Sequence, residues 1–122
     1  MSARLRVWDC HECVLRLVEV VEEARRASAH AWDGRWDRAE EAVREARRHA
    51  EELLEGGCVS EATYEELREA LEGMERGVEE RGAVYVGEHM TGVVGAYTDA
   101  AFDVAELCVE GRRHGRERAS RP

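Results

Sequence analysis

The single proline of this 122-residue chain is at position 122, so nothing in the first 121 residues forbids a continuous helix. The charged residues favour helices too, because every basic residue is Arg and Glu far outnumbers Asp. Arg and Glu are both good helix formers. A chain of this length accommodates one domain with one core. Together these features predict an all-α fold.

Apolar residues recur at alternating steps of three and four in four segments, which are separated by breaks at 31–36, 55–60 and 80–83. In the first segment the predicted buried face consists of Val7, Cys10, Val14, Leu17, Val21, Ala24, Ser28 and Ala31. Short loops favour antiparallel neighbours. We therefore predict an antiparallel up-down-up-down four-helix bundle over residues 1–111, followed by a flexible basic tail over 112–122.

Capping residues agree with these breaks. The first helix is expected to begin near Arg4, and Asp33 is expected to cap the second helix. Gly56 and Gly57 are suited to end the second helix. Ser60, which precedes an acidic first turn, is suited to begin the third.

The first and fourth helices have broader apolar faces than one bundle core requires. The stretches "CVLRLVEVV" (13–21) and "MTGVVGAYTDAAF" (90–102) carry additional apolar residues beside the main stripe. One interpretation is a second buried contact, either with another copy in a homo-oligomer, most simply a dimer, or with a partner protein. The other is that these helices form the inner pair of a monomer.

Glycine pairs occur inside the predicted third and fourth helices. Gly73 and Gly77 are four residues apart, and Gly92 and Gly95 are three apart, so each pair lies on one side of its helix. Each glycine costs a helix about 0.5–1 kcal/mol relative to Ala. The pairs therefore indicate either close approach of another backbone or helices that merely tolerate them.

The four cysteines are expected to meet at one end of the bundle. In an up-down-up-down topology Cys10 and Cys13 lie near the lower end of the first helix, Cys58 lies in the lower loop after the second, and Cys108 lies in the last turns of the fourth. At about 1.5 Å per residue their spread along the bundle is on the order of 10 Å. That spread is small enough for their side chains to converge.

Three interpretations of this cluster remain open. The first is a closed Zn²⁺ site with Cys10, Cys13, Cys58 and either Cys108 or His11 as ligands, since thiolate and imidazole suit tetrahedral zinc. The second is a redox switch in which Cys10 and Cys13, at C-x-x-C spacing, form a disulfide or supply a reactive thiolate. The third is that all four thiols simply pack in the core.

Other metal and cofactor sites are disfavoured. "CHEC" lacks the histidine that must follow the second cysteine for covalent haem attachment, and no histidine has a Glu three residues earlier, as di-iron bundles require. Non-covalent haem between His30 and His89 rests on their placement alone. No nucleophile and base are arranged for catalysis, so a non-enzymatic protein is favoured.

Charge limits the partners. The formal net charge of −9 argues against nucleic-acid binding by the body of the protein. The last twelve residues, "GRRHGRERASRP", carry five Arg against one Glu and are either a frayed helix end or a contact arm for RNA or an acidic partner.

No apolar run approaches the roughly 18 residues of a membrane span. No leader pattern is present, so a cytoplasmic location is expected.

These features lead to one main functional prediction. We predict a small non-enzymatic metal-binding or metal- or redox-sensing protein that uses Cys10, His11, Cys13, Cys58 and Cys108, with zinc as the expected metal. The alternative is a helical adaptor or accessory subunit that binds a partner protein through the apolar faces of its first and fourth helices. In that alternative the cysteines are structural.

Overall fold

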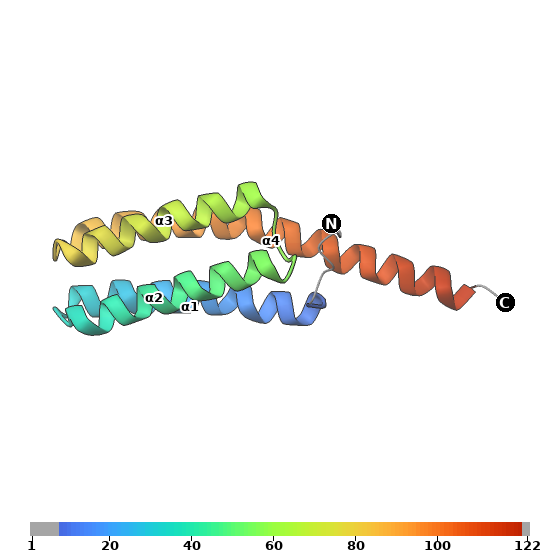
Figure 1. The fold of residues 1–122 in the computed structure, drawn as a ribbon, viewed down its shortest axis with the longest axis horizontal. Helices are drawn as coiled ribbons and strands as arrows, with labels where there is room; N and C mark the ends of the chain where they lie inside the picture. The colour runs from blue at the N-terminus through green and yellow to red at the C-terminus, as the bar shows by residue number, and fades with distance from the viewer. Residues whose placement is uncertain (1–7, 121–122) are drawn as a thin grey trace.

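The computed structural model describes the backbone of residues 8–120 and the side chains of residues 8–110. Its elements are four helices: α1 (Cys10–Trp32), α2 (Trp36–Glu55), α3 (Glu61–Glu79) and α4 (Ala83–Ser120). Successive helices reverse direction through short loops (Figure 1). The described residues contain no strand, and the predicted all-α four-helix bundle is confirmed.

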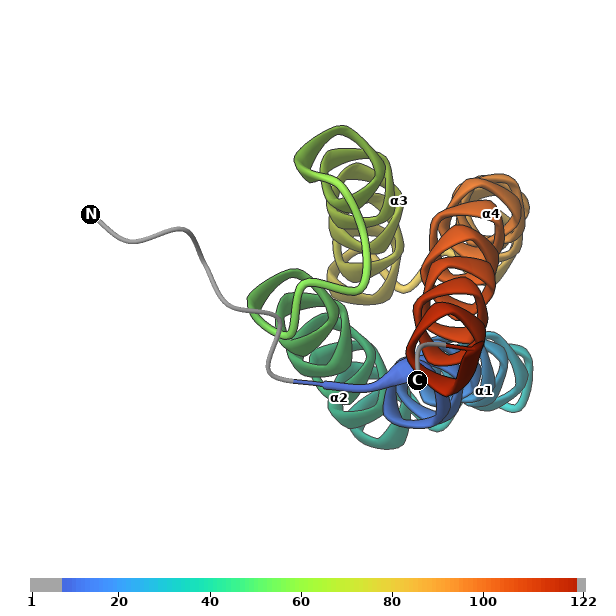
Figure 2. The same ribbon diagram turned by 90° about the vertical axis from the view of Figure 1, so that its right-hand side faces the viewer.

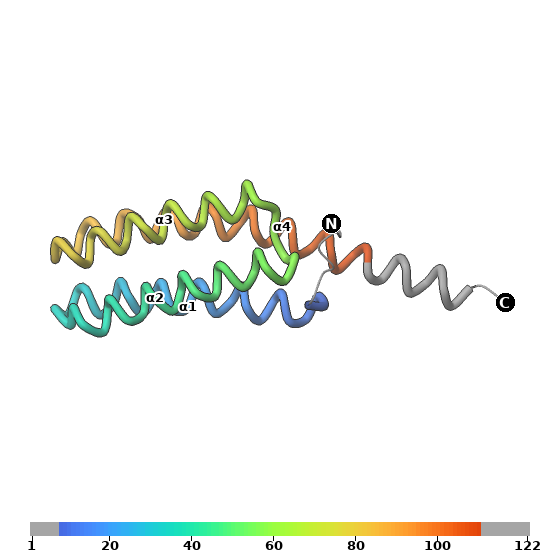
Figure 3. Tube along the Cα trace, viewed as in Figure 1, coloured from blue at the N-terminus to red at the C-terminus, as the bar shows by residue number. Residues whose placement is uncertain are grey.

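The helices follow one another around the bundle axis in chain order. Helix α1 packs against α2 and α4, and α3 packs against α2 and α4. The end-on view shows this square arrangement, and the Cα trace shows α1 beside α2 and α3 beside α4 as two hairpins (Figures 2 and 3). Contacts are most extensive within each hairpin. The bundle is therefore two tightly packed hairpins joined by the α2–α3 loop.

Side-chain caps set the beginnings of α1 and α3. The backbone N–H of Glu12 donates to the side chain of Asp9 at 2.9 Å, so α1 begins at Cys10 and not near Arg4. Ser60 caps α3 as predicted, because its side chain accepts from the N–H of Thr63 at 3.2 Å.

The predicted cap of α2 is wrong. Asp33 follows the last residue of α1 and ends that helix, whereas Arg35 precedes α2. Between them Gly34 has a φ of 73°, in the left-handed region that favours glycine. The chain needs this residue to reverse direction, so α2 starts two residues later than Asp33 would allow.

Helix α4 is the longest element, with 38 residues against 23 for α1. It continues past Cys108 to Ser120, through most of the segment predicted as a basic tail. The side chains of residues 111–120 and all of residues 121–122 lie outside the described part, so the predicted flexibility of that tail stays a prediction.

The buried face of α1 follows the predicted one only in part. Leu17, Ala24 and Ala31 are buried as expected. Cys13 and Val20 are fully buried, whereas Val14 is 41% exposed. Cys13 and Val20 thus take the inward positions predicted for Val14 and Val21, whereas Leu17, Ala24 and Ala31 keep theirs. The apolar residues of α1 cover so wide a sector that spacing alone does not fix the rotation.

Small residues let the helices of each hairpin approach closely. The buried alanines of the first hairpin are Ala24, Ala27 and Ala31 on α1 with Ala39, Ala42, Ala46 and Ala50 on α2. In the second hairpin, a Cβ added at Gly73 would collide with the imidazole of His89, and one added at Gly77 would lie 2.8 Å from a methyl of Val86. Both glycines thus make room mainly for side chains of α4, and only at Gly77 would an added Cβ also lie near backbone, 3.2 Å from the N of Val86.

The second glycine pair behaves differently. A Cβ added at Gly95 would meet nothing within 4 Å, and one added at Gly92 would be 3.4 Å from the Cβ of Ala70. These glycines instead line an open groove between α3 and α4.

Among the described residues, no helix is long and apolar enough to cross a bilayer.

Two Gly→Ala substitutions should change stability in opposite directions. Gly77→Ala forces a methyl group against Val86 and Tyr85 and should destabilise the fold by about 1–3 kcal/mol. Gly87→Ala meets nothing within 4 Å and should stabilise it by roughly 0.5–1 kcal/mol through helix propensity. Urea unfolding followed by circular dichroism measures both, and equal stabilisation by the two would contradict the close contact.

Candidate functional site

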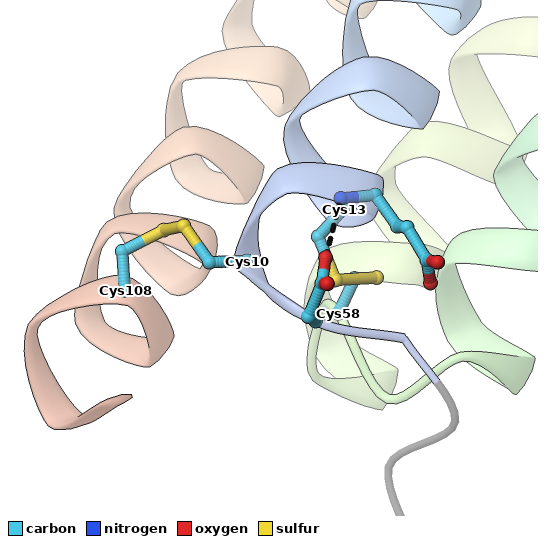
Figure 4. The surroundings of a disulfide bond; sticks show 6 residues. Cys10, Cys13, Cys58 and Cys108 are labelled. Atoms are coloured by element: carbon cyan, nitrogen blue, oxygen red, sulfur yellow. Dashed lines mark hydrogen bonds between the residues drawn. A yellow bond between two sulfur atoms is a disulfide. The ribbon is translucent and has the colours of Figure 1, made fainter. Parts of the chain in front are cut away.

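The four cysteines meet at one end of the bundle, as predicted, but they are paired. Cys10 forms a disulfide with Cys108, and Cys13 forms one with Cys58 (Figure 4). The Cα atoms are 5.1 Å apart in the first pair and 5.5 Å apart in the second, within the usual range for disulfides. The two cysteines of the first pair are separated by 98 positions in the sequence, and those of the second pair by 45.

The first turn of α1 places both bonds. Cys10 is the first residue of the helix and Cys13 is one turn further on, and the Asp9 cap fixes the turn that holds them. Figure 4 shows Cys10 directed toward α4 and Cys13 directed toward the α2–α3 loop. Cys13 and Cys58 are 0% and 1% exposed, whereas Cys10 and Cys108 are half-buried. One helical turn is therefore bonded to two other parts of the bundle.

The predicted zinc site is wrong. All four sulfurs of Cys10, Cys13, Cys58 and Cys108 are used in disulfides, so no thiolate is left to bind a metal. Over residues 8–110, no group of three or more His, Cys, Asp or Glu side chains is arranged to hold a metal ion. His11, the substitute ligand, is exposed on the first turn of α1. The metal-binding and metal-sensing function is therefore overturned.

The redox interpretation also fails in its specific form. It paired Cys10 with Cys13, but residues at i and i+3 on α1 are directed to different partners. The cysteines are structural, as the alternative prediction held.

The disulfides also correct the predicted location. Disulfides form and persist in oxidising environments and are rare in the cytosol. Two of them in one small domain favour an extracellular or secreted environment over the cytoplasm. The cytoplasmic prediction relied on the lack of a leader pattern, and the paired cysteines overturn it.

The two histidines weighed as haem ligands do not share a site. His30 lies in the last turn of α1 and lines a hollow with side chains of α2. His89 lies on α4, where its ring meets that of Tyr85 edge-on at 4.4 Å and lines the groove between α3 and α4. The structure does not bring them together.

The apolar surface of the protein is concentrated on two helices. Every large apolar side chain that is exposed in the described part lies on α1 or α4: Val14, Leu15, Val18, Trp32, Val84, Tyr85, Val94, Phe102 and Val109. We call six of them, Val14, Leu15, Val18, Val94, Phe102 and Val109, the α1–α4 apolar surface. Phe102, the only Phe of the chain, is 67% exposed.

The ion pairs that the structure describes lie on the first three helices. Arg47 of α2 pairs with Glu75 of α3 at 2.9 Å, and within α3 Arg68 pairs with Glu72 at 2.7 Å. On α1, Arg16 pairs with Glu19 at 3.0 Å. The ion pairs of the described side chains all join residues of α1, α2 and α3, and none of them involves α4 over 83–110.

An acidic groove of about 770 Å³ runs between α3 and α4. Its lining residues are Glu66, Glu69, Ala70, Glu72, Arg76, His89, Gly92, Gly95, Ala96 and Asp99. A hydrogen bond to Asp99 and the charge of that carboxylate raise the pKa of Glu66, and Glu69 and Asp103 act in the same direction. Glu66, Glu69 and Asp99 have no ion-pair partner among the described side chains. The groove is therefore net negative, because its four carboxylates outnumber its one Arg, Arg76.

The sequence contained part of the signal for this groove. Glu66, Glu69 and Glu72 recur every three residues on α3, and Gly92, Gly95 and Asp99 lie on the polar side of α4. Helical spacing places each set on one side of its helix. It does not show that the two sets face each other.

Comparisons with protein-family models, with curated proteins and with solved structures found no match to this chain. The function must therefore be argued from the chain's own geometry.

The disulfide pairing can be tested by removing cysteines two at a time. Cys13→Ala with Cys58→Ala should leave Cys10 bonded to Cys108 and should lower the free energy of unfolding by about 2–5 kcal/mol. Cys10→Ala with Cys58→Ala should instead leave two free thiols on Cys13 and Cys108. Alkylation without reductant, read by intact mass, distinguishes the variants. Two reactive thiols in the first variant would contradict the assigned pairs.

The acidic groove predicts a pH effect on stability. Because the pKa of Glu66 is raised in the folded state, the fold holds that proton more tightly than the unfolded chain does. Stability from this group is therefore full below the ordinary Glu pKa of about 4.3 and is lost as pH rises through the raised value. Glu66→Gln should remove this loss, whereas Glu41→Gln on α2 should not. Melting temperatures between acidic and neutral pH test it, and parallel curves for wild type and Glu66→Gln would contradict it.

Proposed function

We propose that this protein is a small disulfide-linked helical adaptor or accessory subunit, which binds another protein chain through its α1–α4 apolar surface. The observation that carries the proposal is the confinement of every exposed large apolar side chain in the described part to α1 and α4. Large apolar groups gathered on one side of a soluble domain are typical of protein-binding sites.

The ion pairs on α2 and α3 support this assignment. Ion pairs such as Arg47 with Glu75 cover α2 and α3 with groups that water solvates well. Helix α4 has no such pairs over its described side chains and exposes Val94, Phe102 and Val109 instead. Burying such half-exposed side chains against a partner is favourable by about 25 cal/mol per Å² of apolar area.

The disulfides give this surface a fixed shape. Cys10 ties the start of α1 directly to α4, so the two helices that carry the surface are covalently joined. A partner that binds both helices then pays little entropy to order them. This is the role that structural cysteines have in an adaptor of this size.

Site-specific photo-crosslinking tests the proposal. A benzophenone amino acid at Val18 or Val94, which are 44% and 48% exposed, should crosslink to another chain in cell extract and medium. The matched positions Glu41 on α2 and Glu65 on α3 are also exposed and should give no product. The captured chain counts whether it is a second copy or a different protein. Equal capture from all four positions, or none from Val18 and Val94, would overturn the proposed function.

A further inference from the structure

The side of α4 that faces away from the bundle carries one aromatic ring among smaller side chains. Exposed residues recur along it at steps of three, four and seven: Thr91, Gly95, Thr98, Phe102 and Val109. We call this set the outer face of α4. The small residues allow another helix to lie close, and Phe102 projects from the middle.

A hollow lies beside Phe102 on the same helix. Its volume is about 300 Å³, and it is lined by Phe102, Ala105, Glu106, Val109 and Glu110. A projecting ring and a hollow within two turns of one helix make the surface complementary to itself. In a contact with two-fold symmetry, the same patch is used on both copies. A two-fold axis near residue 104 therefore brings Phe102 of each copy to the hollow of the other.

We infer that two copies of the chain form a dimer in which their α4 helices pack antiparallel through the outer face, with Phe102 at the centre and the basic segment 111–122 of each copy along the acidic groove of the other. This inference rests on the proposed function, because it names a second copy as a chain that covers α4. It also uses two features that the proposed function leaves unexplained, the acidic groove and the length of α4.

The register of the helices follows from the position of Phe102. In an antiparallel pair of identical helices, the residue numbers of every two facing residues add up to the same total. With residue 102 opposite residue 106, residue 95 lies opposite 113, and the segment 111–122 lies along 86–97 of the other copy. Gly95 belongs both to the outer face and to the acidic groove, so the basic segment arrives beside that groove.

The charges of the two segments are complementary. The segment 111–122 carries five Arg against one Glu. The groove contains Glu66, Glu69 and Asp99, which have no ion-pair partner among the described side chains. Arginine near these carboxylates would relieve their mutual repulsion. A parallel pairing of the two helices would instead place the basic segments side by side.

The basic segment 111–122 does not reach the acidic groove of its own chain. Helix α4 is continuous from Ala83 to Ser120, and residue 112 lies thirteen residues beyond Asp99. At about 1.5 Å per residue this is roughly 20 Å along the helix axis, directed away from the groove. The antiparallel overlap between 88 and 120 is about 50 Å long, which is enough for the roughly 800 Å² per partner of a standard interface.

Sedimentation equilibrium of the purified, oxidised full-length chain tests the inference. Wild type should be a dimer whose dissociation constant rises with salt, because the charge contacts are screened. Phe102→Glu should raise the dissociation constant on the order of 30-fold or more, as for a central aromatic anchor. Val84→Glu is the matched control: Val84 is 62% exposed on the same helix but lies outside the overlap, so its dimer should be unchanged.

A charge exchange tests the antiparallel register. Arg113→Glu with Arg116→Glu should weaken the dimer, and so should Glu66→Arg with Asp99→Arg. All four substitutions in one chain should restore it, because opposite charges again face each other. Circular dichroism and melting curves show that each variant is folded.

Three outcomes would overturn the inference: a wild-type monomer at all concentrations, a dimer indifferent to Phe102→Glu, or a charge exchange that restores nothing. A monomer that still crosslinks to a different protein from Val18 and Val94 would leave the proposed function standing. A wild-type monomer that also gives no crosslink from Val18 and Val94 would refute both proposals.

Discussion

The rest of the structure depends on the covalent attachment of a single helical turn. Cys10 and Cys13, one turn apart at the start of α1, bond to α4 and to the α2–α3 loop. At this end of the bundle the Cys10–Cys108 bond joins the two hairpins directly, and the Cys13–Cys58 bond holds α1 to the loop that connects them. A disulfide stabilises mainly by restricting the unfolded chain, and the restriction grows with the length of the loop that it closes. The bond between Cys10 and Cys108 closes the larger loop, with a sequence separation of 98 residues.

The core explains why such attachment matters. Nine of the 23 buried apolar side chains in the described part are alanine, and the three Trp and the one Phe are not among the buried residues. Alanine permits close helices but buries little apolar area, so each contact contributes less than a Leu would. Larger side chains, such as Leu53, Leu67 and Met74, are concentrated on α2 and α3. A small domain whose core is this rich in alanine therefore depends on covalent cross-links for much of its stability.

The sequence was sufficient for the helices and for the gathering of the thiols, because both follow from short-range spacing and chain direction. It was not sufficient for the chemistry of the thiols. Convergence at one bundle end suits a zinc site and a pair of disulfides equally, and the difference depends on which sulfurs face each other. That in turn depends on the rotation of α1, whose apolar residues fit two faces, one with Val14 and Val21 inward and the observed one with Cys13 and Val20. The acidic groove was missed for the same reason, since the mutual orientation of α3 and α4 is a tertiary property.

The bond between Cys10 and Cys108 links the oxidation state to the proposed surface. Cys108 lies six residues after Phe102, and its bond to α1 fixes the rotation of α4 about its own axis. That rotation decides which residues of α4 face outward and whether Gly95 and Asp99 border the groove beside Glu66. Helix α4 has no ion pair over its described side chains to hold it in the same way. Besides packing, a hydrogen bond from the backbone N–H of Ser60 to the side chain of Asp103, at 3.0 Å, also orients α4 at this end. The disulfide therefore helps to position the proposed binding surface as well as to hold the fold together.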